Sequence, residues 1–312
     1  MTKKIYITET QFRKYLTEEL SIAKEVIDIS NEILSNIFQG YTEGQTQFIF
    51  DAPYNTKVNV QIYSFQNNHD FSNWLDNIEG NELYNGFSFK ENTFYIVGVA
   101  IGGELETTAI ENSVYHEVEH FVQSLKQGKP LQANKYDVIS KNMLNTDPIV
   151  STVCQILYYT TKFELDAFAN GFYGEIRNTD LGSQTLSDII DNSKECRKLL
   201  DRLLTWKAAV NKWTKTPFIN HGRVKLFNLG IIKNIDMEVL KKQLIKRIDK
   251  SYSYLLKRIG KIYTFAKKEY DASINNSVNE NNLLFHDGAF RARKINDTKI
   301  LEDLNRIFEY GN

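Results

Sequence analysis

Apolar residues in the first part of the chain recur at the spacing of a helix. They stand mostly three or four positions apart from Phe12 to Phe38, and Thr8 and Gln11 have the spacing of a capping box. One or two amphipathic helices are therefore predicted between residues 9 and 38.

Three later stretches are rich in β-branched and aromatic residues, with apolar and polar positions alternating, and turn residues separate them. They cover residues 47–50, 57–65 and 93–101. This pattern predicts three β-strands.

The rest of the chain has the pattern of helices. Thr108 and Glu111 have capping-box spacing at the start of a predicted helix of about 20 residues, which ends at the Gly-Lys-Pro of 128–130. A second helix is predicted over about 148–176. Apolar residues at every third or fourth position predict a long core-facing helix through 240–266.

The composition, with 42% hydrophobic and 25% charged residues over 312 positions, excludes disorder as the main state. The longest uncharged apolar stretch, residues 94–103, is about half as long as the roughly 20 residues of a membrane-spanning helix. The first 12 residues contain no apolar segment of signal-peptide type. We therefore expect a cytoplasmic protein with no membrane span, in which Cys154 and Cys196 are reduced and buried.

Charge is distributed unevenly, although the net charge is only −1. Residues 1–193 contain 13 basic and 26 acidic side chains, whereas residues 194–270 contain 20 basic and 6 acidic ones. The contrast predicts a boundary near residue 190. The basic segment would face an anionic partner, a nucleic acid or the acidic half of the same chain, or form an ordinary solvated surface. It contains no recognisable nucleic-acid module.

The predicted helix after residue 107 contains the motif His-Glu-x-x-His at positions 116–120. Histidines four positions apart lie on one face of a helix, so His116 and His120 can bind one divalent ion. Glu117 stands where a carboxylate can take a proton from a water at that ion. The alternative is a pair of ordinary surface or core histidines.

A third ligand is expected from the segment Phe-Glu-Leu-Asp-Ala at 163–167. In a helix, Glu164 shares a face with Ala167, whose small side chain permits a close approach between helices. Asp166 is the second choice, either as the ligand or as a carboxylate that holds the other nitrogen of a histidine. An exposed glutamate near a helix N-terminus is the structural alternative for Glu164.

This combination of His-Glu-x-x-His and a later Glu-x-x-Ala helix resembles the gluzincin branch of the zincin metallopeptidases. The resemblance implies a zinc ion held by His116, His120 and Glu164, with Glu117 as general base. It also implies that the strand at 93–101 is the edge strand that pairs with an extended peptide substrate.

The resemblance covers roughly residues 90–176 and is incomplete. Gln123 and Lys126 replace the Gly and His of a metzincin extension, which excludes that branch, and Phe168 replaces the Asp of a thermolysin-like second motif. Gluzincins commonly add a His or Tyr that stabilises the oxyanion of the reaction. The distant candidate is His221. Three tyrosines are nearer in sequence: Tyr158, Tyr159 and Tyr173.

Residues 5–20 are similar to short N-terminal segments of many tailed-phage proteins. The shared pattern is Ile-Thr-Glu followed by Phe-Arg and then by Glu-Glu-Leu. This similarity implies a phage virion or assembly protein, in the particle or the host cytoplasm. An ordinary capped amphipathic helix has the same pattern.

Together these features predict an α+β protein with three parts. A helical arm at 1–42 precedes a zincin-like domain at 43–190, with a small twisted sheet and an active-site helix, and a basic helical domain follows at 191–312. The expected function is zinc-dependent hydrolysis of peptide bonds in a peptide or protein. The alternative is a phage structural protein with a zincin-like fold and little or no activity, and a nucleic-acid partner for 194–270 is compatible with both.

Overall fold

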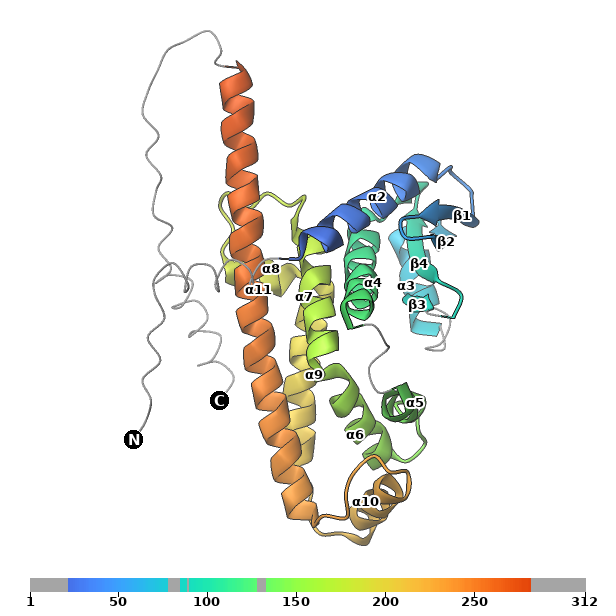
Figure 1. The fold of residues 1–312 in the computed structure, drawn as a ribbon, viewed down its shortest axis with the longest axis vertical. Helices are drawn as coiled ribbons and strands as arrows, with labels where there is room; N and C mark the ends of the chain where they lie inside the picture. Colours follow the sequence, from blue (N-terminus) through green and yellow to red (C-terminus); the bar gives the residue numbers. More distant parts are fainter. Residues whose placement is uncertain (1–21, 78–84, 89, 128–132, 282–312) are drawn as a thin grey trace, which may run out of the picture.

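The computed structural model describes residues 22–77, 85–88, 90–127 and 133–281, and it combines helices with a small mixed sheet (Figure 1). This arrangement confirms the predicted mixture of α and β structure. Helix α2, Lys24–Gly40, confirms an amphipathic helix in this region, but its buried stripe, which includes Val26, Ile33 and Ile37, is displaced from the predicted series, in which Phe38 is exposed. The proposed capping box at Thr8 and the phage-like segment lie outside the described residues.

The sheet contains the three predicted strands and two short ones. Its strands are β1 (Gln47–Ala52), β2 (Thr56–Phe65), β3 (Gly86–Ser88), β4 (Thr93–Ile101) and β5 (Glu104–Leu105). The order is β1-β2-β4-β3, with β2 and β4 parallel, the β1–β2 and β3–β4 pairs antiparallel, and β5 paired to the end of β4. Alternate residues of β2 and β4, such as Val60 and Ile96, are buried beneath the helices.

The expectation that residues 93–101 form an edge strand is wrong. β4 pairs with β2 along its whole length on one side, and its other side pairs with β3 at one end and β5 at the other. Gly102 and Gly103 both have positive φ, which lets the chain turn back tightly into β5. At this end of the sheet the edge strand is β3, which is three residues long and too short to show an alternating pattern.

Helix α4, Thr107–Gln127, carries the His-Glu-x-x-His motif and has the predicted length. It begins before Thr108, so the proposed capping box does not form; the Glu111 carboxylate instead accepts a hydrogen bond from Asn178 Nδ2 at 2.6 Å. The predicted helix over 148–176 is two helices, α6 (Pro148–Tyr159) and α7 (Lys162–Ile176). The break falls at Thr161, whose hydroxyl caps α7 by accepting from the Glu164 backbone N–H.

Helices α4 and α7 pack side by side and antiparallel (Figure 1). Small residues on α7 allow the close approach: Ala167 is fully buried, and the backbone of Gly174 lies against the backbone of Glu111. This contact brings the first turn of α7 beside the middle of α4, where the histidines stand.

The remaining described helices are α3 (Asn68–Asn77), α5 (Ala133–Lys141), α8 (Leu186–Asn192), α9 (Lys194–Asn211), α10 (Pro217–Asn228) and α11 (Met237–Asn281). The predicted apolar stripe of the last helix is confirmed, because Leu240, Leu244, Ile248, Leu255 and Ile259 of α11 are all buried. α11 runs along α7 and α9 (Figure 1).

Buried side chains from α2, the sheet, α4, α7, α9 and α11 form one hydrophobic core. The division at residues 43 and 191 stays a prediction. Cys154 and Cys196 are buried and not joined by a disulfide, as expected. Within the described residues, no helix is long and apolar enough to cross a bilayer.

Candidate metal centre

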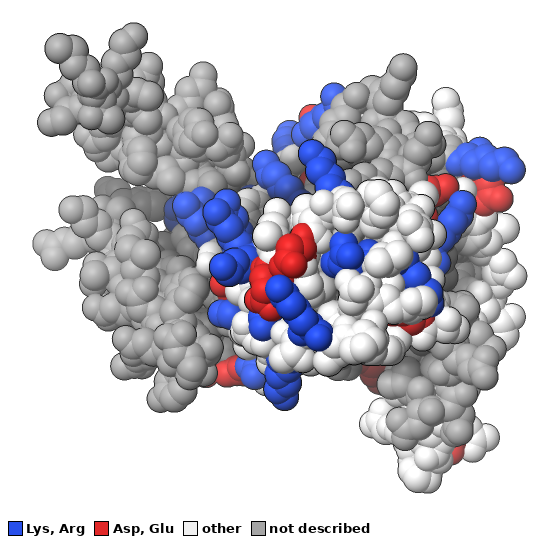
Figure 2. Space-filling model, turned by 90° about the horizontal axis from the view of Figure 1, so that it is seen from below, with Lys and Arg blue, Asp and Glu red and all other residues white. Residues whose placement is uncertain are grey.

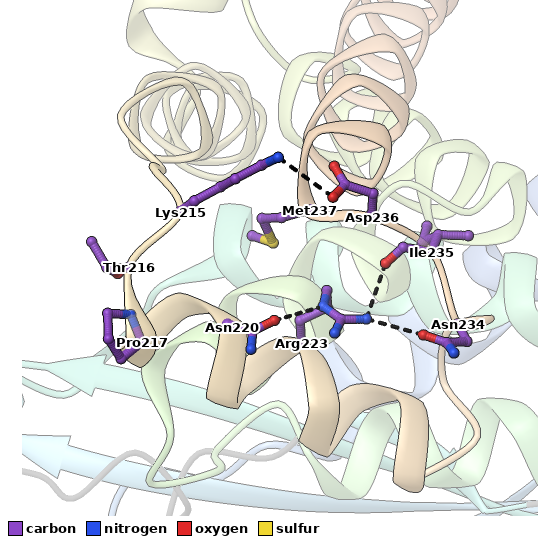
Figure 3. A pocket seen from close by; sticks show the side chains of 9 residues that line it. All are labelled: Lys215, Thr216, Pro217, Asn220, Arg223, Asn234, Ile235, Asp236 and Met237. Carbon is purple, nitrogen blue, oxygen red and sulfur yellow. Dashed lines mark hydrogen bonds and ion pairs between the residues drawn. The ribbon is translucent and has the colours of Figure 1, made fainter.

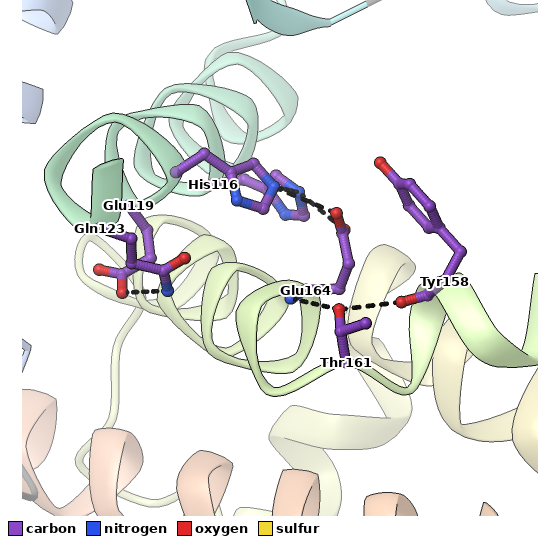
Figure 4. A network of polar contacts seen from close by, with 7 residues as sticks. His116, Glu119, Gln123, Tyr158, Thr161 and Glu164 are labelled. Carbon is purple, nitrogen blue, oxygen red and sulfur yellow. Dashed lines mark hydrogen bonds and ion pairs between the residues drawn. The ribbon is translucent and has the colours of Figure 1, made fainter. Parts of the chain in front are cut away.

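The structure brings together the three residues that were predicted to bind a metal. His116 and His120 project from one face of α4, and Glu164 reaches them from the first turn of α7. Figure 4 shows His116 and Glu164 facing one another. The Nε2 atoms of the two histidines are 3.1 Å apart. Glu164 Oε2 lies 3.8 Å from His116 Nε2, and Glu164 Oε1 lies 3.6 Å from His120 Nε2. This buried group could hold a metal ion.

The spacing of these atoms fits one small divalent ion. A tetrahedral ion with bonds of about 2.0–2.1 Å holds its ligand atoms roughly 3.3–3.4 Å apart. The Nε2–Nε2 separation of 3.1 Å is close to that value, and the distances of 3.6 and 3.8 Å, which involve different oxygens of Glu164, are slightly longer. Three ligands of this kind leave the fourth tetrahedral position open, as in catalytic sites.

Burial keeps both imidazoles neutral at physiological pH. It lowers the pKa of His116 to about 4. For His120, burial and the neighbouring His116 lower the pKa well below its usual value of 6.5. A neutral imidazole is the form that binds a metal ion, so no proton has to leave before the ion binds.

Aromatic rings fix the orientation of the two histidines. The Phe163 ring stacks on His120, with centroids 4.2 Å apart and an angle of 16° between the planes. Phe168, which departs from the thermolysin-like pattern, packs edge-on against His116 with centroids 4.8 Å apart. Van der Waals contact therefore supports the His116 ring at the position where the resemblance predicts an aspartate.

Two buried polar atoms, one on His120 and one on Gln123, lack well-formed hydrogen bonds within the part of the chain that the structure describes. Within the described residues, neither Nδ1 of His120 nor Oε1 of Gln123 has a hydrogen-bond partner of good geometry. An interaction between the two side chains nevertheless raises the pKa of His120, against the larger effects of burial and His116. A small rotation would let Nδ1–H donate to Oε1, which fixes the tautomer that presents Nε2 to the metal.

Gln123 is itself held by a buried polar chain. Its Nε2 donates to Glu119 Oε1 at 2.6 Å, as Figure 4 shows, and Asn170 Nδ2 of α7 donates to Glu119 Oε2 at 2.6 Å. From the sequence alone, Gln123 indicated only that a metzincin extension is absent. Its position three residues after His120, on the same helix, was the available signal for this contact.

Asp166 is not at the metal group, so neither role considered for it is supported. Its Oδ1 accepts from the Tyr254 hydroxyl at 2.6 Å and forms an ion pair with Arg258 Nε at 3.1 Å. Both partners belong to α11. Two positions after Glu164, Asp166 points to the side of α7 that packs on α11 rather than on α4.

Glu117 is buried, and its carboxylate accepts a hydrogen bond from the backbone N–H of Phe87 in β3. Burial, and then the negative charge of Glu164, raise its pKa to about 8. A cation between the ligands would oppose both effects and favour the ionised carboxylate.

His221 does not lie with these residues. It is exposed on α10, which lies at one end of the molecule and away from the α4–α7 contact (Figure 1), and it is within a helix rather than a loop. Tyr158 is closer: at the end of α6, it points toward the group formed by His116 and Glu164 (Figure 4).

A cavity of about 490 Å³ lies between α10 and the start of α11, apart from the metal group (Figure 3). Its cationic side chains already have partners. Arg223 donates to Asn220 and Asn234, and Lys215 is 3.7 Å from Asp236. Nothing in this lining resembles a reactive constellation.

Comparison of the chain with protein-family models, with curated proteins and with solved structures finds no match. The interpretation of the site therefore rests on its geometry and chemistry.

Proposed function

We propose that the protein is a zinc-dependent metallopeptidase. The observation that carries the proposal is the convergence of His116, His120 and Glu164 at separations suited to a tetrahedral ion, with a second carboxylate, Glu117, buried one residue along the helix. Two imidazoles and one carboxylate are a ligand set that zinc uses in hydrolases.

Zinc bound by these residues would polarise a substrate carbonyl and lower the pKa of a water molecule. The chain supplies the remaining chemistry. Glu117, held by the Phe87 N–H, accepts a proton from the attacking water and then donates it to the leaving amine. The Tyr158 hydroxyl, which points toward the ligand group, donates a hydrogen bond to the oxyanion as negative charge develops.

The test is hydrolysis of unfolded protein and of fluorogenic peptide mixtures by the full chain loaded with zinc. We expect cleavage that a chelator abolishes and added zinc restores. Glu117→Gln should reduce turnover by about 100-fold or more, since general-base catalysis contributes about 10²–10⁴, and should leave the zinc content unchanged.

Glu111→Gln is the matched control, because Glu111 is also buried on α4 but faces Asn178, in the turn after α7, instead of the ligands. It should retain activity. Full activity in Glu117→Gln would remove the general-base assignment. Stoichiometric zinc without turnover of any peptide would favour the alternative, a structural or virion protein that uses the metal for stability.

A further inference from the structure

Five exposed lysines lie along one side of α11: Lys242, Lys246, Lys250, Lys257 and Lys268. At 100° per residue they fall within an arc of about 80°, and they span about 39 Å of helix. We call them the lysine stripe. Lys242, Lys246 and Lys250 are successive (i, i+4) neighbours of like charge, an arrangement that destabilises a helix.

Within the described residues, no ion pair neutralises this stripe. Asp249, on the same side of α11, is 2.9 Å from Lys207 of α9. Glu238 and Asp271 flank the stripe near its two ends. The positive charges of the stripe are therefore open to an external partner.

The surroundings of the stripe restrict the kind of partner. The apolar side of α11 is buried in the core through Leu244, Ile248 and Leu255, so it is not available for insertion into a lipid bilayer. None of the aromatic residues of α11 between 242 and 268 is exposed, so bases have no platform for stacking. Lysines also lack the planar fork with which arginine reads a guanine.

The wider surface has the same sign. Figure 2 views the molecule from the end where α10 and the start of α11 lie, and Lys and Arg far outnumber Asp and Glu on this face. Residues 194–270, which include α9 and α10, carry 20 basic and 6 acidic side chains. Such a field attracts polyanions before contact.

We propose that the lysine stripe binds the phosphate backbone of a nucleic-acid duplex without sequence preference. The 39 Å length of the stripe is close to one turn of B-form DNA, about 34–36 Å. A straight row of point charges without aromatic residues suits the regular phosphates of a duplex better than a single strand. This function is separate from the proposed hydrolysis.

The experiment measures binding of the full chain to a fluorescent 24-base-pair DNA of arbitrary sequence between 50 and 200 mM KCl. Five phosphate contacts predict a slope of log K against log salt of about −4.5, or about 500-fold weaker binding across this range. Lys246→Ala, Lys250→Ala and Lys257→Ala combined should reduce the slope to about −1.8.

Two variants make the result decisive. Lys24→Ala, Lys57→Ala and Lys90→Ala combined remove the same charge from exposed positions elsewhere and should leave the slope unchanged. Arginine at the three stripe positions keeps the charge and should retain binding. The proposal is overturned if no DNA binds at 50 mM, if both alanine variants lose binding equally, if single strands bind more tightly than the duplex, or if anionic vesicles bind and DNA does not.

Discussion

Gly174 of α7 offers a sharp test of the helix contact that positions the metal group. A Cβ atom at this position would be 2.6 Å from the Glu111 carbonyl oxygen and 2.7 Å from its carbonyl carbon. Both atoms belong to the backbone of α4, which cannot rotate aside. Ordinary contact begins at 3.4 Å, so α7 and α4 would have to separate locally by about 0.8 Å.

The magnitude follows from comparison with Gly171, on the same helix. An added Cβ at Gly171 would meet the amide of Asn112 at 3.0 Å, and this side chain can shift. Both Gly→Ala changes gain about 1 kcal/mol of helix propensity, so that contribution cancels between them. Overpacking against a rigid neighbour costs about 1–3 kcal/mol, so Gly174→Ala should be less stable than Gly171→Ala by about that amount.

Urea unfolding of the metal-free variants measures this difference, and zinc titration of the same proteins measures its effect on the site. Because Glu164 belongs to α7, we expect Gly174→Ala to bind zinc more weakly than Gly171→Ala. Equal stabilities, or a more stable Gly174→Ala, would refute the reasoning that backbone contact sets the distance between the two helices.

Three further predictions concern the surroundings of the site. Gln123→Ala should weaken zinc binding by about 10–100-fold in a chelator competition, because it removes the oxygen to which His120 Nδ1–H can donate after a small rotation. Unchanged affinity would remove that role. Zinc at 100 times its Kd should stabilise the chain by about 2.7 kcal/mol in thermal unfolding, and His116→Ala should abolish this stabilisation. An equal stabilisation of the variant would mean that the ion binds elsewhere. Burial raises the pKa of Glu111 above its usual 4.5, although Arg177 and Asn178 oppose this shift. The stability that this group contributes to the folded chain is therefore present below pH 4.5 and is lost as the pH rises through the raised pKa of the folded state. The stability of Glu111→Gln relative to the wild-type chain should therefore increase from pH 4 to pH 8 in urea unfolding, and a difference independent of pH would contradict this.

The features that could be predicted from sequence are those with local patterns. The spacing of His116 and His120 places both on one helix face, and a period of three or four residues identifies α11. Glu164 could also be predicted, since a carboxylate beside a small residue at helical spacing can approach another helix.

The features that were missed depend on neighbours far along the chain. β3 is too short for any periodic signal, yet it removes β4 from the edge and holds Glu117. The apolar pattern runs through Thr161 without a Gly or Pro, so the break between α6 and α7 was hidden. The packing of α11 decides that Asp166 turns away from the metal group.

The coordination of zinc in the full chain tests the central claim most directly. X-ray absorption at the zinc edge should show one ion per chain with only nitrogen and oxygen ligands at about 2.0–2.1 Å and the signature of two imidazoles, and Glu164→Ala should change this shell. Less than one zinc per chain, a sulfur ligand at about 2.3 Å, or an identical shell after His116→Ala and His120→Ala would contradict the account.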